Sequence, residues 1–116
     1  ICEGLSKAYS CEIELDYKKD YPVLVNDDQM TQLVVDAINE ANIREVVGVE
    51  DCGPQAQSED FAYYTQHVPA SFFYIGARPD GKAYPHHHPK FDINEDSMII
   101  AAKAMGAVAL KYLRES

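Results

Sequence analysis

YPHHHPKF, residues 84–91, places three of the four histidines of the chain in a row between two prolines. Proline fixes its own φ and biases the residue before it towards extended backbone, so we predict a stiff, extended loop here. Neighbouring side chains of an extended run point to opposite faces, and His87 would then face one way while His86 and His88 face the other. Because neutral imidazole is the commonest metal ligand among side chains, one of these two sets is predicted to face a metal site.

A metal site needs three or more ligands in fixed geometry, and the rest of the chain offers no recognisable set. The other candidate donors have no paired spacing; they are a surplus of carboxylates and His67, Cys2, Cys11 and Cys52. A metal at this loop is therefore expected to take its other ligands from outside the chain. The alternative is that the triplet forms a solvated loop without a role.

The composition excludes several classes of partner. With 116 residues the chain can form one modest domain with a single core. Its 10 basic and 19 acidic residues give a net charge of -9, which argues against nucleic acid and anionic membrane surfaces as partners. An odd number of cysteines at no regular spacing argues against a disulfide framework and favours a reducing, cytoplasmic setting. The longest apolar run, residues 98–110, is too short to span a bilayer.

On the C-terminal side of the histidines, a long helix is predicted after a cap at Asp92 or Asn94. Its core face is expected to consist of the apolar residues at helical spacing, namely Met98, Ile99, Ala102, Met105, Ala109, Leu110 and Leu113. On the N-terminal side, the apolar run 71–76 is typical of a strand covered on both faces. Before it, Ser58 is predicted to cap a helix that ends at Pro69. The apolar face of that helix is predicted to be Phe61, Tyr64 and Val68.

Further towards the N-terminus, residues 26–28 supply caps for an amphipathic helix. Its apolar positions recur at helical spacing, through Met30, Leu33, Val34, Ala37, Ile38 and Ala41. A short strand is predicted over residues 45–50, which contain three valines. Residues 1–9 have helical spacing without a cap, and residues 11–17 alternate apolar and polar side chains as a strand with one buried face does.

This order of elements predicts an α/β architecture. From residue 26 onward the order is helix, strand, helix, strand, helix, which is typical of α/β layering. Two strands alone would leave open sheet edges of a kind that natural domains cover. Together with the uncapped start, these edges lead us to expect a C-terminal fragment of a larger protein.

Three motifs in the chain resemble those of one enzyme family in their order and spacing. They are DYKKDYPVLVND at residues 16–27, SEDFAYY at residues 58–64, and YP followed by HHPKFD within residues 84–92. The family is that of the metal-dependent amidohydrolases and aminoacylases, which includes hippurate hydrolases, N-acetyl-amino-acid deacetylases and auxin-conjugate hydrolases. The resemblance covers essentially the whole chain and corresponds to the C-terminal third of such an enzyme.

The resemblance implies a fold, a chemistry and a partner. Residues 26–116 would be the C-terminal part of a layered α/β metallopeptidase-like catalytic domain, and residues 1–25 the end of a small α+β lid domain. The lid of such enzymes often mediates homodimers. Two divalent metal ions, zinc or manganese, bridged by a water would form the catalytic centre. A glutamate would act as base while the amide bond of an N-acyl amino acid is hydrolysed.

The resemblance also implies roles for individual residues. The last metal ligand of the family stands two residues before a proline and four before a phenylalanine, which is His87 here. His88 stands where the family allows serine or asparagine, so it is expected either in the second shell around the metal or exposed, and His86 is expected to have no role. The backbone at Ser58 and Glu59 would bind a substrate carboxylate at a helix N-terminus, or these residues would only stabilise that helix. The residue before Ser58 is Gln57, where the family usually has glycine or alanine.

The remaining metal ligands and the catalytic glutamate of the family have no counterpart in the chain. The chain by itself is therefore predicted not to hydrolyse amides. Two other functions remain open at this point. One is a binding or assembly module that keeps the fold without the chemistry, and the other is a small metal-binding protein that uses His86 and His88.

Overall fold

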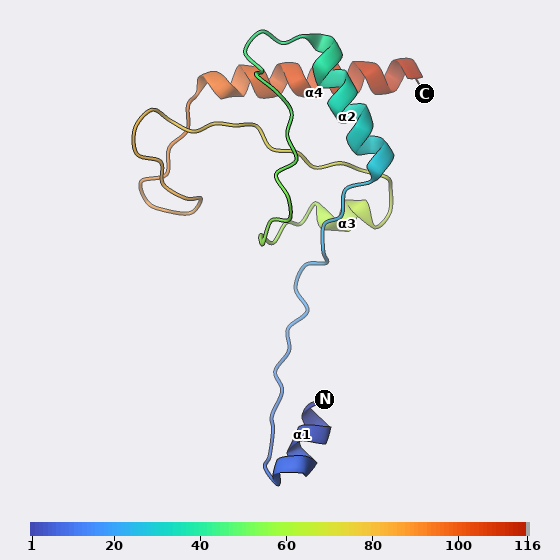
Figure 1. Ribbon diagram of the computed structural model, residues 1–116, viewed down its shortest axis with the longest axis vertical. Coiled ribbons are helices and arrows are strands. Elements are labelled where there is room, and N and C mark those ends of the chain that lie inside the picture. Colours follow the sequence, from blue (N-terminus) through green and yellow to red (C-terminus); the bar gives the residue numbers. More distant parts are fainter. Residues whose placement is uncertain (116) are drawn as a thin grey trace.

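The computed structural model describes residues 1–115 and contains helices but no strand within them. The helices are α1 (Cys2–Tyr9), α2 (Asp28–Ala41), α3 (Ala62–Thr65) and α4 (Asp96–Glu115), as Figure 1 shows. The strands predicted at residues 11–17, 45–50 and 71–76 are therefore wrong for this chain. A β-strand is defined by its hydrogen bonds to a neighbouring strand. Alternating side chains predict an extended backbone, but they do not supply the neighbouring strand.

One local pairing shows how an extended segment is held in place of a sheet. The side-chain amide of Asn26 donates to the carbonyl of Phe72 at 2.8 Å, and its oxygen accepts from the Phe72 N–H at 2.8 Å. Next to it, the Asp27 N–H donates to the carbonyl of Ala70 at 2.9 Å. Asn26 thus replaces a neighbouring strand at a single residue, and the segment before α2 is fixed against residues 70–72.

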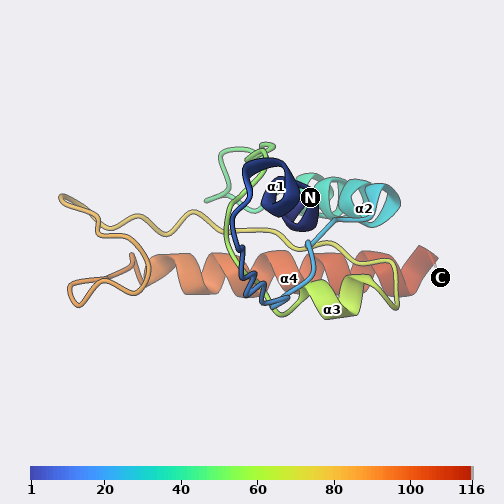
Figure 2. The same cartoon turned by 90° about the horizontal axis from the view of Figure 1, so that it is seen from below.

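The chain is extended for its length. Its Cα radius of gyration is 20.3 Å and its extents are 65 × 41 × 19 Å, whereas a compact domain of about 100 residues has a radius near 13 Å. Figure 1 shows the reason, because α1 lies at the end of a long extended segment that separates it from the other helices, and Figure 2 looks along that segment. The helix predicted over residues 1–9 is confirmed, but α1 buries none of its residues. No helix of residues 1–115 is both long and apolar enough to cross a membrane.

The start and the apolar face of α2 follow the sequence prediction. The Asp27 carboxylate caps the helix by accepting a hydrogen bond from the Met30 N–H at 2.9 Å. Val34, Ala37 and Ile38 are its buried residues. All three belong to the predicted apolar face, so this prediction is confirmed.

α4 begins where it was predicted but buries a different face. The side-chain oxygen of Asn94 accepts from the Asp96 N–H at 3.0 Å, which confirms Asn94 as the residue that stabilises the helix start. The buried residues of α4 are Ser97 and Ala104, and Ala104 packs with Val34 and Ile38 of α2. All seven residues of the predicted core face are exposed, and these are Met98, Ile99, Ala102, Met105, Ala109, Leu110 and Leu113.

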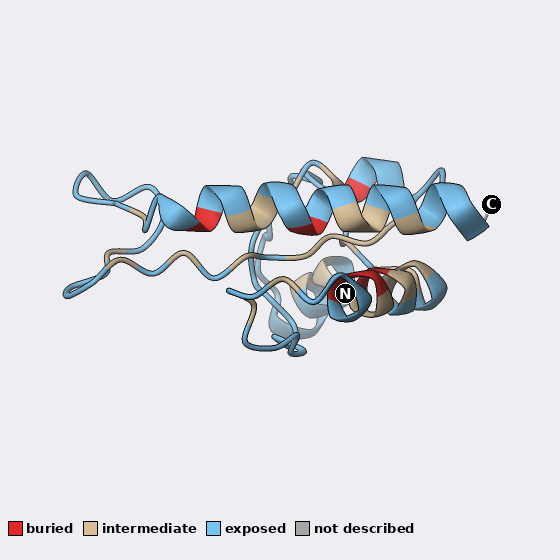
Figure 3. Cartoon of the chain, turned by 90° about the horizontal axis from the view of Figure 1, so that it is seen from above, coloured by how far each residue is buried: buried red, intermediate tan, exposed pale blue. Residues whose placement is uncertain are grey.

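The prediction for α4 failed because this helix has apolar residues on more than one side. Periodicity finds the widest apolar stripe, whereas contact with α2 selects the side with the small residue Ala104, at which two helix backbones can approach closely. Among the described helices, α2 and α4 are the only two that pack together. Figure 3 shows the buried positions of α4 as a few separate patches along an otherwise exposed or half-buried helix.

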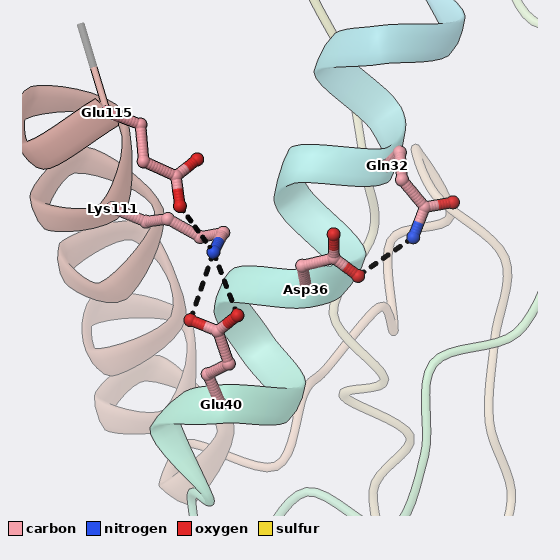
Figure 4. Close-up of polar contacts among 5 residues, drawn as sticks. All are labelled: Gln32, Asp36, Glu40, Lys111 and Glu115. Atoms are coloured by element: carbon pink, nitrogen blue, oxygen red, sulfur yellow. Dashed lines mark hydrogen bonds and ion pairs between the residues drawn. The ribbon is translucent and has the colours of Figure 1, made fainter.

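Ion pairs flank the contact between α2 and α4. The Lys111 ammonium donates to Glu115 at 2.7 Å and to Glu40 of α2 at 2.8 Å, as Figure 4 shows. Hydrogen bonds to Glu115 and Glu40 raise the pKa of Lys111 above its ordinary value. Lys103 donates to Glu45 at 3.2 Å, and a backbone hydrogen bond together with this contact lowers the pKa of Glu45. The contacts of Lys111 with Glu40 and of Lys103 with Glu45 join α4 to α2 and to the residues that follow α2, whereas the Lys111–Glu115 pair lies within α4.

The small core between α2 and α4 makes a stability prediction with a matched control. Ile38 is 6% exposed, whereas Ile99 is 58% exposed on the outer side of α4. We expect Ile38→Ala to lower the free energy of unfolding by about 2–5 kcal/mol, because a buried isoleucine leaves a cavity. The same change at Ile99 should alter it by about 0.5 kcal/mol or less. Urea unfolding followed by circular dichroism of residues 1–116 measures both, and equal losses would contradict this arrangement of the core.

Candidate metal-binding loop

The three histidines lie in a closed loop. The N–H of Asn94 donates to the carbonyl of Ala77 at 3.0 Å and joins the two ends of residues 78–93, which we call the histidine loop. In Figure 1 this loop lies at the N-terminal end of α4, in orange. Its closed ends and internal side-chain packing are those of an Ω-loop, a type of surface loop that is frequently functional.

The centre of the histidine loop consists of two successive turns. The His88 N–H donates to the carbonyl of Pro85 at 3.2 Å, and the Phe91 N–H donates to the carbonyl of His88 at 2.9 Å. His87 is the third residue of the first turn and has a φ of 65°. The prediction of an extended segment is therefore wrong, so the alternation of side chains from which we placed His87 opposite His86 and His88 does not apply to this backbone. A proline restricts only itself and the residue before it, so Pro85 and Pro89 left His86 and His87 free to turn.

Aromatic contacts occupy the outer two histidine rings. The His88 ring stacks on Tyr84 with centroids 4.5 Å apart, and the His86 ring meets Phe91 edge to face at 5.1 Å. The His88 Nδ1 atom also accepts a hydrogen bond from the Lys90 N–H at 3.0 Å. Both rings are thus held by the loop's own residues.

The His87 imidazole is different from its two neighbours. It is exposed, and no hydrogen bond, ion pair or ring contact of this side chain occurs within residues 1–115. A neutral imidazole of this kind is suited to one coordination position of a zinc or manganese ion. No group of three or more histidine, cysteine or acidic side chains in the described part of the chain could hold a metal ion. His87 can therefore supply one ligand, and residues 1–115 do not supply a complete site.

Ser58 and Glu59 lie before α3, and their local structure differs from the prediction. α3 begins only at Ala62, and Phe61 is its N-terminal flanking residue without a side-chain cap. The Glu59 carboxylate accepts from the Phe61 N–H at 3.2 Å, whereas Ser58 is exposed. Ser58 as the helix cap is therefore wrong. The Glu59 carboxylate accepts from the N–H of Phe61, next to the helix, instead. The sequence did not distinguish the two residues, because serine and glutamate both favour helix starts.

The structure does not bring Ser58 and Glu59 together with the histidines. Within the described residues no hydrogen bond, ion pair or ring contact joins either of them to the histidine loop. Figures 1 and 2 both show α3 well away from that loop. One further contact near α3 was missed by the sequence, since the Tyr74 hydroxyl donates to the side-chain oxygen of Gln57 at 2.8 Å.

Two pockets lie near these segments. The smaller, of about 320 Å³, is lined by residues of the histidine loop that include Tyr84, His86 and Phe91. The larger, of about 570 Å³, lies between the start of α2 and the residues after α3, and His67 lines it. Tyr84 and Phe91 were not predicted as site residues, although an aromatic residue on each side of the histidines was a visible signal.

Comparison with known proteins identifies the family. A model of the Peptidase family M20/M25/M40 matches residues 3–111. "Putative amidohydrolase YhaA" of Bacillus subtilis is 40% identical over 97% of the chain, and N-acetyl-L-cysteine deacetylase of the same organism is 36% identical over 88%. The chain spans 28% and 23% of these two relatives, so it corresponds to less than a third of their length.

A solved structure agrees with these relatives. It is described as a putative aminohydrolase from methicillin-resistant Staphylococcus aureus, and it matches 97% of the chain with 48% identity and a TM-score of 0.84. The chain covers 28% of that structure. The resemblance of the motifs to metal-dependent amidohydrolases is thereby confirmed, and the chain belongs to the peptidase family M20/M25/M40, whose members include amidohydrolases and deacetylases.

Proposed function

We propose that residues 1–116 are the C-terminal part of a dinuclear-metal amidohydrolase that hydrolyses the amide bond of N-acyl amino acids. Residues 26–116 would complete its α/β catalytic domain, and residues 1–25 would end its lid domain. The family match, the relative named as an N-acetyl-L-cysteine deacetylase and the share of each relative that is covered all support this proposal. The extended form of the chain supports it too, because many apolar side chains here lack a covering surface.

The observation that supports the metal role best is the state of the His87 side chain. It is the one member of the histidine triplet whose ring makes no contact within residues 1–115, while His86 and His88 are held by aromatic neighbours. His87 would contribute an imidazole nitrogen to one of two zinc or manganese ions. Such ions, when bound, polarise the scissile carbonyl and lower the pKa of water towards neutrality. The other ligands and the glutamate base would come from the larger part of the intact protein.

The same proposal assigns Ser58 and Glu59 to binding of the substrate. The Ser58 hydroxyl is exposed and makes no hydrogen bond within the described residues, so it is available to a ligand. The Glu59 carboxylate is engaged with the Phe61 N–H and would shape the start of α3. In the intact enzyme these residues would approach the site from another direction than His87.

The assembly is a further part of the proposal. Ile13, Leu15 and Tyr17 are 39%, 67% and 72% exposed and alternate with charged residues along the extended segment after α1. An apolar row of this kind is suited to one face of a sheet. We infer that it is covered in a lid domain through which the enzyme forms a homodimer, and that the protein works in the cytoplasm, where its three free cysteines stay reduced.

Removing and restoring the metal tests the proposed activity. The intact protein that contains residues 1–116 is treated with a chelator, and hydrolysis of a panel of N-acetyl and N-benzoyl amino acids is followed by release of the free amine. We expect turnover to disappear after chelation and to return with zinc or manganese. Turnover that chelation leaves unchanged would contradict the metal role. Binding of N-acyl amino acids without turnover would favour a non-catalytic module.

A further inference from the structure

We propose that His88 and Tyr84 are positioning residues that hold His87 in its left-handed backbone conformation and thereby aim its imidazole. This inference rests on the proposed metal role of His87 for its functional meaning, although the conformation itself can be measured separately. It assigns the histidines of the triplet different roles. His87 would bind the metal, and His86 and His88 would hold the loop that orients the His87 imidazole.

The backbone at His87 needs such support. A φ of 65° lies in the left-handed region, which L residues other than glycine adopt at a cost in free energy. A turn whose third residue has positive φ usually has glycine or asparagine there. His87 keeps this conformation only if the surrounding residues stabilise the turn more than they would stabilise an ordinary one.

His88 stabilises the turn through its backbone and its ring. Its N–H closes the first turn on Pro85 at 3.2 Å, and its carbonyl accepts from Phe91 in the second turn at 2.9 Å. Its Nδ1 accepts a hydrogen bond from the Lys90 N–H at 3.0 Å. The same ring stacks on Tyr84 with an interplanar angle of 19°. A hydrogen bond at the ring edge and a stack on the ring face together leave His88 one orientation.

Tyr84 joins this arrangement to the start of the loop. It is half-buried, and the ammonium of Lys82 lies 5.1 Å from the centre of its ring. On the other side of His87, the ring of His86 packs edge to face against Phe91. The two ring pairs thus involve residues on both sides of His87 and leave its own ring without a contact. In this inference the rings of His86 and His88 support the loop and do not bind metal. It therefore differs from the hypothesis of a metal site that uses His86 and His88 as ligands.

Zinc affinity of the intact protein tests the role of His88. Competition with a chromophoric chelator is measured for five variants, namely His88→Ala, His88→Asn, His88→Phe, His87→Ala and His67→Ala. We expect His88→Ala to weaken zinc binding about 10–100-fold, as loss of a partner that orients a ligand does. His88→Asn keeps an acceptor for the Lys90 N–H and His88→Phe keeps the stack on Tyr84, so each should restore part of the affinity. His67→Ala removes an exposed histidine outside the loop and should bind zinc as the unchanged protein does.

Two results of this experiment would overturn the inference. Unchanged zinc affinity in His88→Ala would show that the ring does not position His87. A loss in His88→Ala as large as that in His87→Ala, with no recovery in His88→Asn or His88→Phe, would make His88 a ligand and not a positioning residue.

A second measurement separates this inference from the proposed function. In protein labelled at histidine, a residue with positive φ has a strong nuclear Overhauser effect between its own N–H and Hα protons, because the two are unusually close. We expect this signal at His87 in the unchanged protein and its weakening in His88→Ala. If His87→Ala bound zinc normally, the metal role would fail, while this signal would still decide whether His88 holds the turn. An equally strong signal in His88→Ala would overturn the positioning role.

Discussion

His87→Ala is expected to abolish metal-dependent hydrolysis by the intact protein. The His87 side chain is exposed and uncommitted within the described residues, so its loss should not disturb packing. It would remove one ligand from a site that needs at least three. Zinc affinity should fall by more than the roughly 10–100-fold that loss of an outer partner costs. Chelator competition measures the affinity, and amine release from an N-acetyl amino acid measures the activity.

A glycine variant separates loss of the ligand from loss of the loop conformation. Glycine adopts positive φ without steric cost, so His87→Gly keeps the turn and removes only the imidazole. We expect the same loss of zinc affinity as in His87→Ala, with partial recovery when free imidazole is added. Near-normal zinc binding in both variants would show that His87 is not a ligand.

Residues 1–116 by themselves are expected to hydrolyse no N-acyl amino acid, whichever divalent metal is added. The described part of the chain contains no group of three potential ligands, and a single imidazole does not hold a zinc ion in catalytic geometry.

The comparison is made between the purified chain and the intact protein at equal concentration, with zinc and with manganese. The intact protein serves as the positive control, and the His87→Ala variant of the isolated chain serves as the background. Turnover by the isolated chain that needs metal and disappears in this variant would contradict the prediction. It would mean that residues 1–116 assemble a complete site, for example between copies of the chain.

The histidine loop shows how far sequence reasoning reached for the site. The motif around His87, together with the motifs at residues 16–27 and 58–64, pointed to the correct family, because the order and spacing of such motifs are sequence properties. The backbone of the loop was predicted as extended and forms two turns instead. Proline restricts only itself and the residue before it, whereas the two turns are closed by hydrogen bonds from the His88 and Phe91 N–H groups, which the positions of the prolines do not determine.

The helices show the same division. α2 was predicted correctly, since its cap at Asp27 and its one apolar stripe are local features. α4 was located correctly, but its buried side was not, because contact with Val34 and Ile38 selected Ala104 over the larger apolar residues. An amphipathic pattern predicts the buried face of a helix only when the apolar residues are confined to one face.

The amino-acid sequence by itself determined the family, the positions of the two long helices, and the short segments that hold their caps, residues 26–28 and Asp92 or Asn94. These depend on residue type and short spacing. The tertiary structure alone decided which side of α4 is buried, the turn at His87 and the absence of strands within residues 1–115. The buried side of α4 and the lack of strands depend on contacts between segments distant in the sequence, because burial and strand pairing are properties of two surfaces in contact. The turn at His87 depends on a backbone conformation that the positions of the prolines do not set.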